Sequence, residues 1–453
     1  MRLFLKKYGP FIFLFFFVLY SFLIAYNLFF GDTIVNYGFS YAITRGEVPY
    51  VDYNLIIPLF SPFLYSIFLF ISKSFLFYYI VQSIFVVLFF IVLFKLLDNK
   101  WSLLLPIVFL GFPIPIVTIL FPGYNFILLF LLILVIYCEI EEKSDYLIGF
   151  LLGLMILTKH TLGVLFFLPS LLYLRQLQKI GKRILGLLIP ISVFVFYLFI
   201  SHSFFEFINL CILGLFDFAG ENSTVMEYWL WVPFLLCMGY VIFRIFKQKK
   251  DIFPYYVLIS SLFVYPLFDA YHLSFFLFLT MCLFLYYSKF ICKNVTFYVL
   301  VFLVFLAGLW TFITFSFRGG VYHFQNYPNY PLRYLKDSDK KHYEEIQKFM
   351  EDWKEPVILF GLGTENYFYK ITNDLDITYF DLPNYGNYGY HGMEMMIQKF
   401  EELPTDSVIL IDKNILEDDN YNQQYYKDLA YYVIENYRKL KKVGRYTAYL
   451  KEK

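Results

Sequence analysis

Residues 76–97 of the chain, LFYYIVQSIFVVLFFIVLFKLL, contain a single charged residue, Lys95. A helix needs about 20 consecutive apolar residues to cross a bilayer core roughly 30 Å thick, so this stretch predicts a transmembrane helix. Similar runs recur on both sides of it, and one of them, 146–174, is long enough for one tilted helix or a broken pair. The further predicted spans are 10–30, 55–72, 101–120, 126–140, 146–174, 184–200, 230–246, 253–268, 273–289 and 295–315.

The composition agrees with about eleven spans. The 453 residues are 60% hydrophobic and only 16% charged, whereas soluble proteins carry roughly 25% charged residues. A chain this apolar needs lipid to cover it, and a net charge of +1 excludes a strongly basic nucleic-acid binder. The cysteines form no CxxC pair and predict neither a disulfide nor a zinc framework; they are Cys138, Cys211, Cys237, Cys282 and Cys292.

The basic residues predict the orientation of the chain. They cluster at the N-terminus and at 175–183, 244–250 and 289–293, and such clusters face the cytoplasm. The first apolar run is too long for a signal peptide and lacks a small-residue cleavage site, so we expect it to be retained. Eleven spans place the N-terminus in the cytoplasm and the C-terminus outside. The prolines between 101 and 122 leave room for a short or re-entrant segment there.

The composition changes after Phe317, which predicts a transmembrane domain over 1–317 and a water-soluble domain over 318–453. We expect helices at 339–353, 392–400 and 421–437. Short apolar runs predict strands at 357–360, 377–380 and 408–412, with an edge strand at 446–450. Strands that alternate with helices predict a small α/β domain. The Gly361-Leu362-Gly363 segment lacks the third glycine of a dinucleotide fingerprint, so we interpret it as a tight turn from strand to helix.

Asp32 is the strongest candidate for chemistry. It follows the first predicted span and precedes a short predicted helix, 33–44. A carboxylate at the membrane surface can accept a proton from an attacking hydroxyl. The alternative is a helix N-cap, a position that aspartate favours, and the two interpretations are compatible. Arg45 and Glu47 lie in the same loop and could bind sugar or phosphate, or could be solvated loop charges.

Two further segments place ionisable residues near the membrane. Lys159 and His160 interrupt an otherwise uncharged run, and ionisable residues at membrane depth usually serve a function. A lysine suits a phosphate as a point charge, although it could instead mark a helix end that reaches the surface. His272 could neutralise a phosphate with Asp269 as its partner; the alternative is an interfacial turn.

The first loop resembles the first extracytoplasmic loop of the GT-C glycosyltransferases, in particular the bacterial members similar to protein mannosyltransferases and aminoarabinose transferases. These members show an acidic residue, a Gly-x-x-Pro-Tyr-x-Asp segment and a proline. The matching residues here are Asp32, Gly46, Pro49, Tyr50, Asp52 and Pro58. Where the family often has Asp-Glu, this chain has Asp32-Thr33. Leu157 to Gly163, the Asp269–Leu273 corner and the tail after Gly361 also resemble family segments.

The resemblance implies a GT-C-like polytopic fold and an inverting transfer of a sugar from a polyprenyl-phosphate donor to a hydroxyl of a glycan, lipid or protein. Asp32 would be the catalytic base. Substrate-binding residues would be Arg45, Asp52, Lys159, Asp269 and His272. No cofactor is implied, and the sequence gives no support for a metal. Tyr124-Asn125 stands where some members carry a second carboxylate. The alternatives are a transporter or flippase of lipid-linked glycans and a non-catalytic assembly partner.

Overall fold

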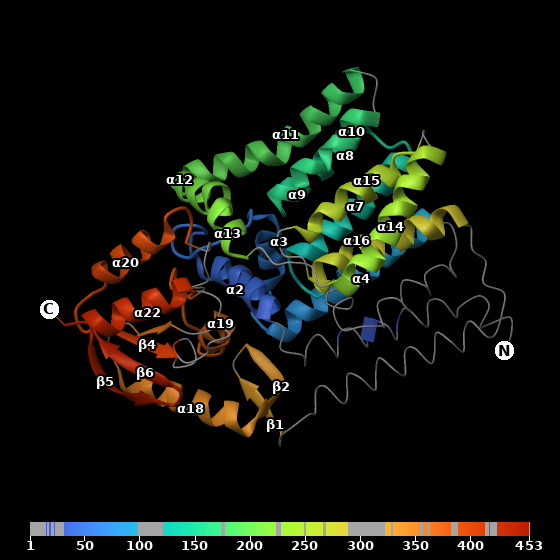
Figure 1. The fold of residues 1–453 in the computed structure, drawn as a ribbon. Coiled ribbons are helices and arrows are strands. Elements are labelled where there is room, and N and C mark those ends of the chain that lie inside the picture. Colours follow the sequence, from blue (N-terminus) through green and yellow to red (C-terminus); the bar gives the residue numbers. More distant parts are fainter. Residues whose placement is uncertain are drawn as a thin grey trace, which may run out of the picture.

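The computed structural model describes residues 15, 18, 19, 22, 31–97, 121–173, 177–222, 228–248, 251–265, 269–288, 322–327, 329–353, 357–360, 363–381, 388–412, 416 and 424–452. These residues form a bundle of apolar helices and a smaller domain with a four-stranded sheet (Figure 1). The predicted spans at 10–30, 101–120 and 295–315 lie outside the described residues, apart from four positions of the first. The predicted domain boundary at 317 lies outside them as well.

Three described helices are long and apolar enough to cross a membrane. They are α4 (Phe75–Leu97), α11 (Leu177–Ile200) and the segment Leu230–Lys247 of α14 (Tyr228–Lys247). Shorter apolar helices complete the bundle: α3 (Phe60–Leu69), α7 (Tyr124–Ile140), α8 (Asp145–Ile156), α9 (His160–Leu165), α10 (Phe167–Tyr173), α15 (Phe253–Ser260), η2 (Ser261–Val264) and α16 (Ala270–Ser288).

A buried ionic network marks one end of this bundle, which we call the Arg183 end. Arg183 of α11 donates to Asp145 at the start of α8 (2.9 Å, Nε to Oδ1) and to Glu139 near the end of α7 (2.8 Å, Nη2 to Oε2). The Tyr256 hydroxyl donates to the same Glu139 carboxylate at 3.0 Å. Four helices are therefore fixed together at this end, and the opposite end carries Asp32; we call it the Asp32 end.

Residues 145–173 form a re-entrant hairpin and do not cross the bundle. Both ends of this segment lie at the Arg183 end, because Arg183 Nη1 donates to Ser170 Oγ of α10 at 2.9 Å while Asp145 begins α8. The tip of the hairpin is the turn at 157–159, where the Leu157 carbonyl accepts from the Phe60 amide (3.0 Å). The broken pair, one of the two possibilities for 146–174, is the one found.

Two glycines let the hairpin pack closely against α11. A Cβ added at Gly149 would lie 2.0 Å from the Arg183 carbonyl oxygen, and one at Gly153 would lie 2.7 Å from that of Leu187. This Gly-x-x-x-Gly spacing places both glycines on one helix face, where small residues allow backbones to approach closely in a membrane. The contact therefore holds the first arm of the hairpin against α11.

The predicted span at 55–72 is wrong. The helix there, α3, has 10 residues, about 15 Å at 1.5 Å per residue, which is half of a bilayer core. Its start lies beside Leu157, and just after its end the Lys73 carbonyl accepts a hydrogen bond from Tyr37 of α2. Both ends therefore lie at the Asp32 end. Hydropathy alone could not tell this short, partly exposed helix from a membrane-spanning one.

The C-terminal domain is built on a mixed sheet with the strand order β3-β4-β6-β5. Strand β3 (Val357–Phe360) pairs in parallel with β4 (Val408–Asp412), and β4 and β5 (Arg438–Val443) pair antiparallel with β6 (Tyr446–Leu450). Helices α18 (Asp337–Asp352), α19 (Gly363–Thr372), α20 (Gly392–Glu402) and α22 (Gln424–Asn436) accompany the sheet, and β1 (Tyr322–Tyr327) and β2 (Tyr330–Lys336) form a separate hairpin.

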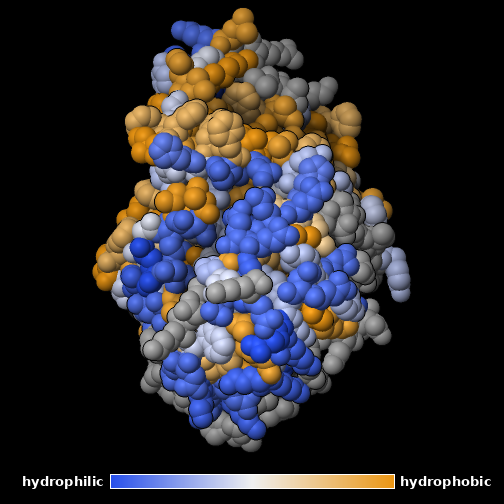
Figure 2. Space-filling model, turned by 90° about the vertical axis from the view of Figure 1, so that its left-hand side faces the viewer, coloured by the Kyte–Doolittle hydropathy of each residue, from blue (hydrophilic) through white to orange (hydrophobic). Residues whose placement is uncertain are grey.

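Most of the predicted elements of this domain are confirmed, with two corrections. Residues 377–380 form no strand; instead, the Asp381 carboxylate accepts from the Thr378 amide and closes a turn. Strand β6 lies inside the sheet and not at its edge, because β5 pairs with its outer side. The sequence of β5 is mostly basic and alternates only weakly between apolar and polar residues, so it was not predicted as a strand. The surface divides accordingly: Figure 2 shows apolar residues over the helical bundle and hydrophilic residues over the C-terminal domain.

Candidate functional site

Helix α2 (Gly31–Arg45) carries Asp32 in its first turn. The predicted helix at 33–44 is confirmed, but it begins two residues earlier, so Asp32 lies inside the helix and is not a residue that precedes it. An acidic side chain is favourable there because it faces the positive end of the helix dipole. The Asp32 side chain is exposed, and its carboxylate makes no hydrogen bond to the described residues. It is therefore held by its helix and open to a ligand.

The structure brings Asp32 together with three other predicted site residues. Lys159, Asp269 and His272 all lie close enough to Asp32 to interact electrostatically with its carboxylate. Lys159 lies at the tip of the 145–173 hairpin, and Asp269 and His272 lie at the start of α16. Four residues from three distant segments of the chain thus meet at the Asp32 end, and we call them the Asp32 cluster.

Asp269 and His272 form a dyad in this cluster. Asp269 precedes α16, and its Oδ1 accepts from the His272 amide at 2.8 Å. The same oxygen lies 2.8 Å from His272 Nδ1, so an ionised Asp269 requires Nδ1 to carry a proton and leaves Nε2 for another partner. Burial alone would raise the pKa of Asp269, but the hydrogen bonds and charge of His272 hold that pKa below its usual value.

Lys159 contributes a cation that no described side chain neutralises by direct contact. Its backbone is extended between α8 and α9. Its Nζ lies 4.2 Å from the centroid of the Phe263 ring and 5.4 Å from that of Tyr124. Among the described residues, its ammonium makes no hydrogen bond or ion pair. Two aromatic rings therefore hold a positive charge next to Asp32, which makes it available to an anion.

The Asp32 carboxyl group has a pKa raised above its ordinary 3.8. Desolvation of the carboxyl group by nearby protein atoms is the main cause, because these atoms displace water that would stabilise the charged form. Asp269 adds to the increase by repulsion, while His272 and Lys159 oppose it by attraction. An aspartate with a raised pKa is a stronger base than an ordinary one, provided that it is ionised.

Several residues around the cluster were not predicted. Asn125 Nδ2 donates to the Tyr271 hydroxyl at 2.9 Å, and Asn125 Oδ1 is buried without a partner among the described residues. Tyr124 and Phe263 flank Lys159. From the sequence, Asn125 stands only where some members of the resembled family carry a second carboxylate. In a chain with 43 tyrosines and 59 phenylalanines, the aromatic members carried no distinguishing signal.

Arg45 and Asp52 do not join the Asp32 cluster. Arg45 ends the 15-residue helix α2, about 20 Å along the axis from Asp32. It makes ion pairs with Asp374 (3.0 Å, from Nη1) and Asp376 (2.5 Å, from Nε) of the C-terminal domain. Asp52 Oδ2 accepts from the Val48 amide at 2.6 Å and shapes the loop. Among the described residues, no group of three side chains could hold a metal ion.

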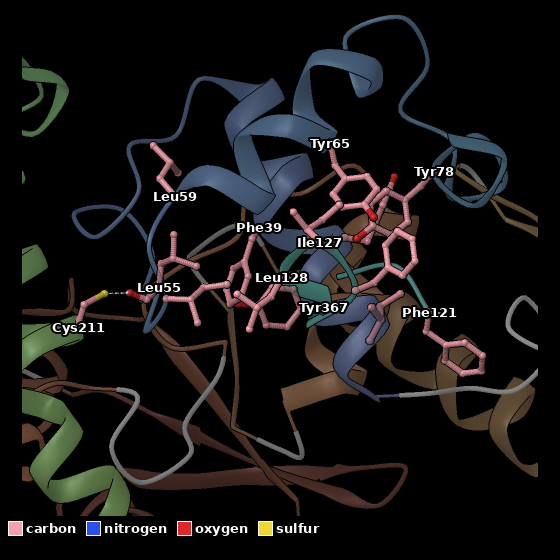
Figure 3. Close-up of a cluster of buried hydrophobic side chains, with 14 of the residues drawn as sticks. Phe39, Leu55, Leu59, Tyr65, Tyr78, Phe121, Ile127, Leu128, Cys211 and Tyr367 are labelled. Carbon is pink, nitrogen blue, oxygen red and sulfur yellow. Dashed lines mark hydrogen bonds between the residues drawn. The ribbon is translucent and has the colours of Figure 1, made fainter. Parts of the chain in front are cut away.

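A core of aromatic and aliphatic side chains supports α2 from behind. Figure 3 shows Phe39 of α2 near Tyr367 of the C-terminal domain, with Tyr65, Tyr78 and Leu128 in the same cluster. The ring centroids of Phe39 and Tyr367 are 5.9 Å apart, in an edge-to-face arrangement. The helix that carries Asp32 is therefore packed between the bundle and the C-terminal domain.

No family model matches the chain, and neither a curated protein nor a solved structure is significantly similar to it.

Proposed function

We propose that this protein is an inverting glycosyltransferase. It moves a sugar from a polyprenyl-phosphate donor to an acceptor hydroxyl of a glycan, a lipid or a protein at the outer face of the membrane. The observation that carries the proposal is the Asp32 cluster: an accessible carboxylate next to an uncommitted ammonium and an Asp-His dyad. The cluster lies where the apolar helices meet the hydrophilic C-terminal domain, so a lipid-linked donor and an acceptor hydroxyl can both reach it.

The donor requires a site where a phosphate meets lipid. Lys159 offers a charge-assisted bond to the phosphate, and His272 offers Nε2. Two exposed apolar side chains, Leu262 and Tyr265, lie next to Phe263 in the sequence, and the Phe263 ring contacts Lys159. They suit the first isoprene units of the carrier. A site that combines a half-buried cation with exposed apolar side chains favours an amphipathic phosphate over a free sugar phosphate.

In the proposed reaction, Asp32 accepts the proton of the acceptor hydroxyl as its oxygen attacks the anomeric carbon. A C–O bond forms there while the bond from that carbon to the phosphate oxygen breaks, and the electron pair leaves with the polyprenyl phosphate. Lys159 and His272 stabilise the charge that develops on this phosphate. The leaving group is already ionised, so one carboxylate is enough, in contrast to the two of a glycosidase. The neutral Asn125 agrees with this arrangement.

The orientation of the chain follows from the basic residues. Arg244 of α14 stacks on Tyr287, and Tyr287 donates to Asp251, next to the start of α15. These residues therefore lie at the Arg183 end, near the other basic cluster. If basic clusters face the cytoplasm, the N-terminus is cytoplasmic and the Asp32 cluster and C-terminal domain are extracytoplasmic. The protein is then a multi-pass cell-membrane protein with no nucleic-acid partner.

A flippase for lipid-linked glycans is the second candidate, and one observation favours it. Transporters often build their sites from discontinuous helices, and the 145–173 hairpin is broken at Lys159, next to the cluster. A flippase would bind the same phosphate but would leave the bond between sugar and phosphate intact. Asp32 would then have no proton to accept.

A donor-cleavage assay separates the two functions. Purified protein in lipid nanodiscs would be incubated with short-chain polyprenyl-phospho-sugars and a mixture of membrane glycolipid acceptors. A transferase releases polyprenyl phosphate, and the Asp32→Asn protein does so far more slowly. In proteoliposomes, a flippase instead moves a fluorescent donor analogue across the bilayer without releasing polyprenyl phosphate. Movement without cleavage would overturn the proposal, and binding with neither activity would indicate an assembly partner.

A further inference from the structure

We propose that the C-terminal domain positions the Asp32 carboxylate through helix α2, with Tyr367 as the positioning residue. This inference rests on the proposed function only in that Asp32 is the base whose position matters. Figure 1 shows α2 between α19 and the helical bundle. The two faces of the helix contact different parts of the molecule, and each contact can be described separately.

The Tyr367 ring lies directly against the backbone of α2 at Gly38. A Cβ added at Gly38 would lie 2.1 Å from Tyr367 Cδ1 and 2.5 Å from Cε1, so the ring occupies the space of a side chain. Tyr367 is fully buried, and its hydroxyl has no hydrogen-bond partner among the described residues. Packing of the ring, and not a polar bond, therefore fixes this contact.

A second group of contacts holds the other end of α2. Arg45 pairs with Asp374 and Asp376, and Glu47 Oε1, just beyond the helix, accepts from the Ile377 amide at 3.2 Å. Residues 363–377 of the C-terminal domain therefore hold α2 at its middle and at its end. These contacts couple the position of α2 to that of the C-terminal domain.

The remaining members of the Asp32 cluster belong to the bundle. Lys159 lies on the hairpin and His272 on α16. Helix α2 also packs against the bundle, along α3 and through Tyr37, which lies edge-to-face on Phe75 with ring centroids 4.9 Å apart. A shift of the C-terminal domain against the bundle therefore changes the position of Asp32 relative to Lys159 and His272. The C-terminal domain therefore influences the geometry of the Asp32 cluster, although none of the four cluster residues belongs to this domain.

A distant contact fixes the orientation of the domain on the bundle. The π-helix η1 (Ile208–Leu213) carries Asn209, whose side chain accepts from the Tyr390 amide at 3.0 Å. Asp217 of α13 (Gly214–Asn222) accepts from the His391 amide at 3.2 Å. With contacts at both α2 and η1, the domain has one defined position, and α2 transmits that position to Asp32.

Four variants and one control test the inference. Gly38→Ala forces the Tyr367 ring away, and misplacement by about 1 Å can cost a reaction on the order of 10²-fold, so kcat should fall by about that factor while KM for the donor changes little. Tyr367→Phe should behave like the native protein, and Tyr367→Ala should lose turnover. The double variant, Gly38→Ala with Tyr367→Ala, should recover part of the loss of Gly38→Ala. Gly239→Ala, where a Cβ meets nothing within 4 Å, is the control and should be unchanged.

Hydrogen exchange without substrate makes the test independent of the proposed function. The amides of residues 35–37 close the first turn of α2, and Gly38→Ala should speed their exchange, as Gly239→Ala should not. Unchanged exchange in that turn, or a donor KM that rises as kcat falls, would overturn the inference. Absence of transfer by the native protein would instead overturn the proposed function and leave the exchange result intact.

Discussion

One carboxylate oxygen of Asp269 accepts from both the main-chain amide and ring Nδ1 of His272, each at 2.8 Å. The same atom therefore caps helix α16 and orients the imidazole. An Asp269→Asn variant separates these two roles, because asparagine caps helices about as well as aspartate but offers no negative charge to the ring. A hydrogen bond to a charged group contributes about 1.5–3 kcal/mol.

We therefore expect turnover of Asp269→Asn to fall by roughly 10- to 100-fold, the rate equivalent of that energy. The thermal unfolding midpoint should remain close to that of the native protein. Steady-state kinetics and a melting curve on the same preparation test both points. If Asp269→Asn turns over at the native rate, Asp269 serves only as a helix cap.

Asp32→Asn tests the proposed base. The substitution keeps the size of the side chain but removes its ability to accept a proton, so turnover should fall by on the order of 10²–10⁴-fold. Donor binding, measured by titration, should change much less, because the carboxylate acts on the acceptor. Asp32→Glu should retain only a trace of activity, since the longer side chain misplaces the oxygen. Asp52→Asn is the matched control, because Asp52 hydrogen-bonds within its own loop.

The raised pKa of Asp32 predicts the acidic side of the pH profile. As a base, Asp32 works only when ionised, so kcat should fall as the pH drops through its pKa, and this should occur at a higher pH than for an ordinary aspartate. Lys159 lowers that pKa, so in Lys159→Met the decline should move to still higher pH, together with weaker donor binding. If kcat declines at the same pH in this variant as in the native protein, Lys159 does not influence the pKa of Asp32.

Glu47 predicts a pH-dependent stability of the contact between α2 and the C-terminal domain. Burial raises the pKa of Glu47 to about 8, with a further increase from Asp376 and opposing effects of the Ile377 amide, Lys370 and Arg45. Since the folded protein holds the proton and the unfolded chain does not, stability falls as the pH rises from about 4.5 to 8.

Glu47→Gln removes this titration. The variant should therefore be more stable than the native protein at pH 9, and the difference should shrink towards pH 5. Thermal unfolding in detergent at the two pH values measures it, and Glu402→Gln on the exposed end of α20 provides a control. A difference that is the same at both pH values would mean that Glu47 does not titrate in this range.

The orientation is tested by fusions after Lys453. Alkaline phosphatase at this position should be active and green fluorescent protein dark, because an extracytoplasmic location supports only the first reporter. The reverse pattern would place the Asp32 cluster in the cytoplasm and remove access to an outer-face donor.

The sequence predicted the elements whose signal is local. Residues 76–97 and 184–200 were predicted as spans from their continuous apolar sequence, and they lie in helices long enough to cross a membrane. Asp32, Lys159, Asp269 and His272 were selected as ionisable residues within or beside apolar runs, and the structure places them close together. The re-entrant path of 145–173 and the short helix α3 could not be predicted, since they depend on contacts with Arg183 and Leu157 that are distant in sequence. Arg45 was predicted to bind substrate, but it pairs with Asp374 and Asp376. These partners lie more than three hundred residues away in the sequence, so the ion pairs could not be predicted.

The re-entrant hairpin also constrains the order in which the protein is assembled during synthesis. The turn at 157–159 ends α8, and the Leu157 carbonyl there is paired by the Phe60 amide of another segment; a peptide group without such a partner is not tolerated next to lipid. Helix α8 therefore cannot settle in the bilayer by itself when it leaves the ribosome. Gly149 and Gly153 of α8 can pack only after α11 has been synthesised. Arg183 of α11, which bonds to both ends of the hairpin, is synthesised after the hairpin itself. Insertion of 145–200 is thus expected to occur as one unit, and a chain truncated before α11 should leave Lys159 outside the membrane and be a substrate for membrane quality-control proteases.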